Sequence, residues 1–224
     1  MKRVALGRAP SGVVDVRRKR TAKWVAYYEQ GQGSKPADAD WRKFAGPLAT
    51  LFHGLCGYCE RHCKGDVDHF RPKSRFPRLV YRWSNWVYSC PTCNSRHKGE
   101  KWPGCGFVNP CARRTAKPPG HYFRFDLLTA EIVPREHLTP AEFEMADTTI
   151  RELRLNDYSA HLKPRFDLLA LAGEAVRLAR RNKAELANLV HLLSASGREH
   201  GTLLRQFIDE KVTVPARQRH SPGA

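Results

Sequence analysis

A pair of Cys-x-x-Cys motifs constrains the fold of this chain more than any other feature. The pairs are Cys56/Cys59 and Cys90/Cys93, with 30 residues between the inner cysteines. Two such knuckles bring four thiolates around one tetrahedral zinc ion. Because four protein ligands close the coordination sphere, this zinc has a structural role and leaves no position for substrate. The spacing therefore predicts a zinc-stapled module over this segment.

The segment between the knuckles carries side chains suited to hydrolysis. Asp68 and His69 are adjacent, Asn85 follows, and Asn94 comes directly after the last cysteine. A histidine is well matched to removing a proton from water near neutral pH, and an aspartate offers the hard oxygen that Mg²⁺ prefers. Asn85 is expected to hydrogen-bond the His69 ring. Asn94 is expected to offer its amide oxygen to the cation held by Asp68, with His97 as the substitute ligand.

The chain is strongly basic, with 39 Lys and Arg against 22 Asp and Glu and a formal net charge of +17. Such an excess favours a polyanionic partner, of which nucleic acid is the commonest, although a solvated basic surface is an alternative. Near the central segment, four basic residues are expected to contact phosphates: Arg71, Lys73, Arg96 and Lys98.

A second basic run begins a predicted helix over residues 17–30. Its first turns contain five basic residues: Arg17, Arg18, Lys19, Arg20 and Lys23. Cations at a helix N-terminus oppose the helix dipole. The run therefore indicates an acidic partner, either DNA or another chain, or else a solvated helix start.

The second half of the chain has a helical pattern. Thr139, Pro140 and Glu142 form a capping-box signature, and Phe143 and Phe166 are among the apolar residues expected to be buried behind it. Pro164 and Gly173 are expected to interrupt the helices. Residues 121–134 alternate apolar and polar side chains on both sides of a turn, which predicts a short hairpin.

The central motifs resemble those of HNH endonucleases. They are Cys56-x-x-Cys59, Val67-Asp-His-Phe-Arg-Pro-Lys73, Trp83-x-Asn85, Cys90-x-x-Cys93-Asn94 and Lys98-Gly. The resemblance implies a ββα-metal fold in which His69 is the general base, Asn85 orients it, and Asp68 with a residue of the helix binds catalytic Mg²⁺ or Mn²⁺. The last histidine of the HNH pattern is Asn94 here, which leaves Asn94 and His97 as alternatives for completing the cation site.

Shorter motifs resemble the HNH nucleases of retron- and Septu-type bacterial anti-phage systems. They are the opening MKRVALGRAP, Lys98-Gly-x-Lys-Trp-Pro103, Val108-Asn-Pro110 and Leu-x-Leu-Asn156. This resemblance implies an effector nuclease that works with an ATPase partner subunit and cleaves DNA, with RNA left open.

The expected fold class is α+β, with a zinc-stapled nuclease core inside a mainly α-helical chain. The expected divisions are an N-terminal arm and helices over 1–53, the core over 54–104 and a loop with the hairpin over 105–138. A helical region over 139–212 and a disordered basic tail over 213–224 follow. No apolar run approaches the roughly 20 residues of a membrane span, and the N-terminus has no secretion signal. A cytoplasmic protein is therefore expected.

Two functions remain open from the sequence alone. The first is a metal-dependent endonuclease that hydrolyses phosphodiester bonds. The second is a non-catalytic zinc-ribbon subunit that binds nucleic acid or a partner. The second function explains the cysteines and the charge, but gives no reason for Asp68, His69, Asn85 and Asn94 to occur together.

Overall fold

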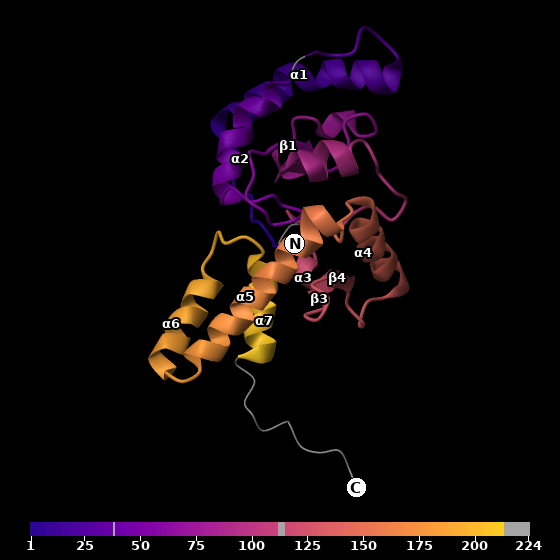
Figure 1. Cartoon of the computed structure of the whole chain (residues 1–224). Coiled ribbons are helices and arrows are strands. Elements are labelled where there is room, and N and C mark those ends of the chain that lie inside the picture. Colours follow the sequence, from indigo (N-terminus) through magenta and orange to yellow (C-terminus); the bar gives the residue numbers. More distant parts are fainter. Residues whose placement is uncertain (38, 112–114, 213–224) are drawn as a thin grey trace.

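A computed structural model describes residues 1–37, 39–111 and 115–212. The predicted tail over 213–224 lies outside the described residues. In Figure 1, α1 lies at one end of the molecule, α2 and β1 lie side by side beneath it, and α5, α6 and α7 form the opposite end. One hydrophobic core runs through all these parts, from Trp24 through Trp86 to Leu203. None of the described helices is long and apolar enough to cross a membrane.

The first helix begins earlier than the sequence predicts. Helix α1 spans Ser11–Gln30, so the extended arm ends at Pro10 and not at residue 16. A proline is tolerated at the start of a helix, because the backbone N–H that it lacks would have no partner within the helix. The helix ends at Gly31, whose left-handed φ of 66° suits a residue without Cβ. A 3₁₀ segment, Asp40–Phe44, and helix α2, Ala45–Leu51, then lead to the first cysteine pair.

A small hairpin and one helix form the centre of the molecule. Strand β1, Asp66–His69, pairs antiparallel with β2, Trp86–Ser89, so that Asp68 faces Val87 and His69 faces Trp86. Two 3₁₀ segments, Pro77–Leu79 and Trp83–Asn85, shape the connection between the strands. The π-helical segment Thr92–Lys98, called the site helix below, follows β2 and carries Asn94. This arrangement of two strands and a helix is the predicted core of an α+β chain.

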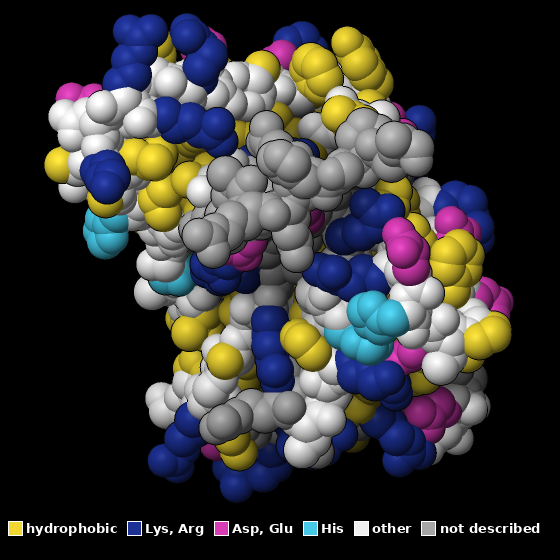
Figure 2. Space-filling model, turned by 90° about the horizontal axis from the view of Figure 1, so that it is seen from below, with side chains coloured by type: hydrophobic (Ala, Val, Ile, Leu, Met, Phe, Trp, Pro, Cys, Tyr) yellow, Lys and Arg dark blue, Asp and Glu magenta, His cyan; other side chains and the backbone are white. Residues whose placement is uncertain are grey.

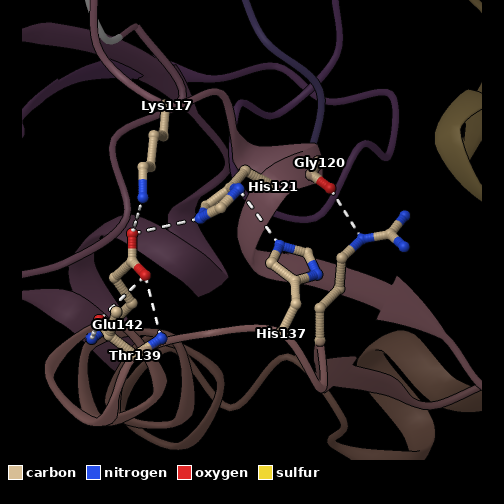
Figure 3. A network of polar contacts seen from close by, with 7 residues as sticks. Lys117, Gly120, His121, His137, Thr139 and Glu142 are labelled. Carbon is tan, nitrogen blue, oxygen red and sulfur yellow. Dashed lines mark hydrogen bonds and ion pairs between the residues drawn. The ribbon is translucent and has the colours of Figure 1, made fainter.

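The predicted hairpin is present beyond the core. A short helix α3, Pro119–Tyr122, precedes strand β3, Phe123–Phe125, which pairs with β4, Ile132–Pro134. Figure 3 shows how this part is tied to the next helix: the Glu142 carboxylate pairs with Lys117 at 2.5 Å and with His121 at 3.2 Å. A second histidine, His137, lies 3.2 Å from the other ring nitrogen of His121.

Helix α4, Pro140–Glu152, has the predicted start. The Thr139 hydroxyl accepts from the Glu142 N–H, and the Glu142 carboxylate accepts from the Thr139 N–H, which closes the capping box. The expected burial of Phe143 is wrong, because its side chain is 51% exposed. The buried face of α4 runs instead through Ala146, Thr149 and Leu153. Thr149 is buried because its hydroxyl bonds the Met145 carbonyl and accepts from the Val108 N–H, a role that apolar periodicity misses.

The last helices differ from the predicted pattern in where they break. A π-helical turn, Tyr158–Leu162, leads into α5, Lys163–Ala179, followed by α6, Lys183–Ser194, and α7, Gly201–Lys211. Pro164 lies in the first turn of α5, where a proline is tolerated, and Gly173 lies inside the helix without breaking it. The break falls at Asn182, whose side chain caps α6. Phe166 is 53% exposed, so its predicted burial is also wrong.

Candidate active site and zinc centre

The four cysteines predicted to bind zinc lie together. The Sγ atoms of Cys56, Cys59, Cys90 and Cys93 are all within 4.8 Å of one another, and no other group of this kind occurs among the residues that the structure describes. The first knuckle is held against β2, because the Gly57 N–H donates to the Tyr88 carbonyl. A set of four convergent thiols at two knuckles fits a tetrahedral zinc ion.

The close packing of the thiols favours loss of a proton from one of them. Hydrogen bonds with Cys56, and then with Cys59 and Cys93, hold the pKa of Cys90 far below its ordinary value. Hydrogen bonds among the thiols also raise the pKa of Cys59 and of Cys93, and the bond to Cys56 is the largest cause for both. Because zinc binds thiolates, binding of the ion would release protons from the cluster.

The helical region contributes polar side chains to the surroundings of the thiols. His161 Nε2 lies 4.0 Å from Cys93 Sγ. The guanidinium of Arg165 is buried nearby and donates to the Leu155 carbonyl at 2.7 Å and to Asn156 Oδ1 at 3.2 Å. Their placement depends on tertiary packing, so no sequence pattern around the cysteines indicates them.

A cleft of about 260 Å³ lies beside the zinc module and brings three predicted site residues together. Asp68 and His69 enter it from β1, and Asn94 enters it from the site helix. Trp41 and Lys73 also line it. Although neighbouring residues of a flat strand point to opposite faces, Asp68 and His69 border the same cleft here.

The His69 ring is fixed in one orientation. Nε2 lies 2.8 Å from the Val80 carbonyl oxygen, and the Trp41 ring meets it edge to face with centroids 4.8 Å apart. A carbonyl only accepts, so Nε2 carries the proton and Nδ1 has a free lone pair. Burial, with the charges of Lys73 and then Lys98, lowers the pKa of His69 to about 3. The ring is therefore uncharged at neutral pH and able to take a proton.

Asn85 bonds the backbone near His69 and not the His69 ring itself. Its Oδ1 accepts from the Arg71 N–H at 2.9 Å, and its Nδ2 donates to the carbonyls of Arg71 at 3.0 Å and Leu79 at 3.3 Å. The predicted hydrogen bond to the His69 ring is wrong, because the Val80 carbonyl takes that place. Asn85 fixes the backbone on both sides of the loop that presents this carbonyl.

Asp68 is buried and engaged through both oxygens. Oδ1 accepts from Lys98 Nζ at 3.0 Å, and Oδ2 accepts from the Tyr58 hydroxyl at 2.5 Å. Lys98 Nζ also donates to the His69 carbonyl at 2.8 Å, and only 1% of its side chain is exposed. The predicted phosphate contact by Lys98 is therefore wrong: its ammonium is committed to β1 and does not reach solvent.

The two alternatives for the helix ligand point in different directions. Asn94 lines the cleft with Asp68. His97 is buried on the other side of the site helix, where its Nδ1 donates to the Leu153 carbonyl at 2.9 Å and its ring lies edge to face with His161. The cleft therefore offers a carboxylate and an amide oxygen, both hard ligands suited to Mg²⁺ or Mn²⁺. A carboxylate has about four lone-pair positions, so the two hydrogen bonds to Asp68 do not use all of them.

Comparison with known proteins agrees with this geometry. Residues 56–100 match the sequence profile of the HNH endonuclease family. This segment is an HNH domain. The chain is also similar to two proteins named Septu protein PtuB. The one from Bacillus mycoides (strain KBAB4) is 32% identical over 127 residues, which are 48% of this chain and 40% of the relative. The one from Bacillus thuringiensis is 36% identical over 73 residues, 28% of this chain and 26% of the relative. The matched part thus spans less than half the length of these curated relatives.

Of the other three basic residues expected to contact phosphates, only Lys73 lines the cleft. Its Nζ lies 3.3 Å from a Glu100 carboxylate oxygen and above the Trp41 ring. Arg71 is exposed, and its guanidinium lies 5.4 Å from the Phe76 ring centroid and 5.6 Å from that of Trp102. Arg96 is exposed on the site helix.

Two further residues of the site were not predicted as such. Tyr58 lies between the cysteines of the first knuckle and reaches Asp68, and Trp41 precedes α2 and packs on His69. Tyr58 is directly before Cys59, so its position inside a knuckle was the only sequence signal for it. Trp41 has no such signal, since an apolar residue at helical spacing is commonly part of the core.

Proposed function

We propose that this chain is a metal-dependent endonuclease that hydrolyses phosphodiester bonds in DNA and acts in bacterial anti-phage defence. The observation that carries the proposal is the cleft shared by Asp68, His69 and Asn94 inside an HNH domain. The same cleft has no explanation in a zinc ribbon that only binds.

His69 is the proposed general base. Its Nε2–H is held by the Val80 carbonyl, which in turn also accepts from Trp86 Nε1 at 2.8 Å, so the ring is fixed with Nδ1 free. The low pKa keeps this nitrogen unprotonated at neutral pH. An anionic phosphate in the cleft raises the pKa of the ring, because a nearby negative charge favours the imidazolium. The base therefore becomes stronger when the substrate is present.

Asp68 and Asn94 are the proposed ligands of a catalytic Mg²⁺ or Mn²⁺ ion. When bound, such an ion supplies positive charge that stabilises the phosphate as negative charge develops on it. Tyr58 and Lys98 hold the Asp68 carboxylate from both oxygens, so that it does not turn out of the cleft. Asn85 is a positioning residue, because it acts through the backbone that presents Val80.

The phosphate is held by the basic residues that remain accessible. Lys73 lines the cleft and Arg96 is exposed on the site helix. Arg71 is exposed, its guanidinium lies near the Phe76 and Trp102 rings, and it suits a phosphate outside the cleft. Phosphate contacts of this kind position the substrate without reading its sequence.

Anti-phage defence is proposed from the similar proteins. Both are named Septu protein PtuB, and the longer match extends beyond the 56–100 segment, since it covers 127 aligned residues. The resemblance to the HNH nucleases of such systems further implies an ATPase partner subunit. Co-purification of this chain with the product of an adjacent ATPase gene, followed by size-exclusion chromatography, tests that partner.

The catalytic proposal is tested with plasmid DNA in the presence of Mg²⁺ or Mn²⁺. His69→Ala is expected to reduce cleavage by about 10²–10⁴-fold, the usual contribution of a general base. Asp68→Ala is expected to lose cleavage through loss of the cation, and Asn85→Ala is expected to have a milder effect. The matched control is His191→Ala, which removes an exposed histidine of α6.

Zinc content and DNA binding are measured on each variant beside cleavage. If His69→Ala retains zinc and cleaves at the wild-type rate, the catalytic assignment is wrong. A wild-type protein that binds DNA but cleaves neither DNA nor RNA supports the non-catalytic zinc-ribbon function instead.

A further inference from the structure

A groove outside the cleft is lined by four arginines. It lies between α1 and the segment 78–82, has a volume of about 660 Å³, and is called the α1 groove below. From α1 it is lined by Val14, Arg17, Arg18, Thr21 and Val25, which recur at helical spacing on one face. The other wall is made by Arg78, Leu79 and Arg82. Two of the five residues of the basic run noted in the sequence, Arg17 and Arg18, thus face a surface that carries more arginine.

The charge of the α1 groove is only partly neutralised. Arg78 pairs with Glu29 at 2.7 Å, and Arg18 lies 3.4 Å from Asp15 in an exposed contact. Arg17 and Arg82 are both exposed, and neither forms an ion pair with any residue in the described part of the chain. The groove therefore has positive charge that is available to an anion.

The groove wall belongs to the same loop that orients the catalytic histidine. Leu79 lines the groove and its carbonyl accepts from Asn85 Nδ2, while the next residue, Val80, bonds the His69 ring. On the helix side, Trp24 of α1 contacts Trp41, which packs on His69. The α1 groove and the cleft are therefore linked through residues 79–80 and through the contact of Trp24 with Trp41.

We propose that the α1 groove binds the phosphate backbone of duplex DNA that flanks the position of cleavage. This inference rests on the proposed function, since it assumes that the substrate is DNA. Guanidinium groups form bidentate bonds with phosphate oxygens. The floor between them is apolar, with Val14 63% exposed, and this suits contact with sugar carbons and not with bases. The groove thus supplies affinity and orientation without sequence readout.

The test measures the salt dependence of DNA binding. The full-length, zinc-loaded protein is titrated into a short labelled duplex without Mg²⁺ or Mn²⁺, and fluorescence anisotropy is recorded over a series of salt concentrations. The double variant Arg17→Gln/Arg82→Gln is expected to have a less steep dependence of log affinity on log salt. The magnitude of the slope should fall by about 0.9 for each phosphate that is no longer neutralised, or about 1.8 for both. The Arg17→Lys/Arg82→Lys pair keeps the charge and is expected to retain the slope.

The control must remove the same charge elsewhere, because the protein is basic on several faces. Figure 2 shows Lys and Arg side chains also spread over the face seen from below, which lies away from α1 in Figure 1. Arg181→Gln with Arg205→Gln removes two exposed arginines near α6 and from α7. This control pair is expected to leave the slope unchanged.

The binding measurements test the α1 groove, and the cleavage measurements test the proposed nuclease activity. A slope that stays at the wild-type value in Arg17→Gln/Arg82→Gln overturns the α1 groove as a DNA site, and so does an equal fall in both pairs. Failure of the wild type to bind duplex also overturns it and favours an acidic protein partner. Plasmid cleavage by the wild type is measured in parallel, so loss of the groove proposal leaves the nuclease proposal standing where cleavage persists.

Discussion

The HNH domain and the helical region over residues 140–211 are stabilised in different ways. The HNH domain has two four-residue strands and one seven-residue helix, and it is held by a thiol cluster, a buried ion pair and side chains bonded to backbone carbonyls. The helical region is held by apolar faces and by side-chain caps at Thr139 and Asn182. The difference means that polar substitutions should be severe at the buried groups of the HNH domain and mild at the exposed ion pairs and caps of the helical region.

The largest expected effect follows removal of the zinc ligands. Cys90→Ser should lose zinc and unfold the HNH domain, because a structural zinc site contributes on the order of 10 kcal/mol of binding free energy to folding. Metal analysis and near-ultraviolet circular dichroism measure this loss. Cys105→Ser, outside the cluster, should keep the metal. A Cys90→Ser protein with full zinc content and the wild-type melting curve would contradict the closed four-cysteine site.

The next largest effect is expected when a buried ion pair is broken, compared with an exposed one. Lys98→Met leaves the Asp68 carboxylate buried and without its ammonium partner, which should cost about 3–5 kcal/mol of unfolding free energy. Lys163→Met breaks a pair with Asp167 whose side chains are both more than half exposed, and should cost less than about 1 kcal/mol. Urea unfolding of both variants gives the two values. Equal losses would mean that burial does not distinguish the regions.

A cap should matter less than the buried pair. Thr139→Ala removes the hydroxyl that accepts from the Glu142 N–H, and should cost about 1 kcal/mol. Amide hydrogen exchange in the first turn of α4 should rise with it, while exchange in the HNH domain stays unchanged. Ser196→Ala, at an exposed position before α7, serves as the control. Faster exchange in β1 or β2 would show that α4 and the hairpin unfold together.

The smallest effect is expected at an apolar residue that the sequence pattern assigned to the core. Phe143→Gln should change the unfolding free energy by less than about 0.5 kcal/mol, because the side chain is exposed. Leu153→Ala, at the C-cap of the same helix, should cost about 2–5 kcal/mol, since Leu153 is fully buried. A large loss with Phe143→Gln would place this ring in a contact that the described residues do not make.

The two regions also differ in how far the sequence predicts them. In the HNH domain the cysteine spacing and the Asp68-His69 pair point to the zinc centre and the cleft, because metal and proton chemistry restrict the residue types. The partners of those residues are backbone carbonyls, at Val80 for His69 and at Leu153 for His97. Carbonyls have no sequence signature, so the role of Asn85 and the direction of His97 required the fold.

In the helical region the capping box predicted the start of α4, whereas Pro164 and Gly173 did not mark helix breaks and apolar periodicity did not predict burial. The Thr139 capping box is a short-range interaction and is present as predicted. Phe143 and Phe166 match the helical period, yet both are exposed, and the buried positions near them belong to Thr149 and Arg165. Burial of a threonine or an arginine depends on partners from distant segments, Val108 and Leu155.

The contacts between the HNH domain and the rest of the chain bear on how such a protein can evolve by recombination. The Glu60 carboxylate accepts from the Thr202 hydroxyl and N–H, the Arg61 guanidinium donates to the Ala160 carbonyl, and His97 donates to that of Leu153. Moved alone into a new host protein, the 56–100 segment would lose these three partners. Each buried polar group left unsatisfied costs about 1–3 kcal/mol. A successful transfer would therefore have to carry the helices with it, or replace all three contacts together.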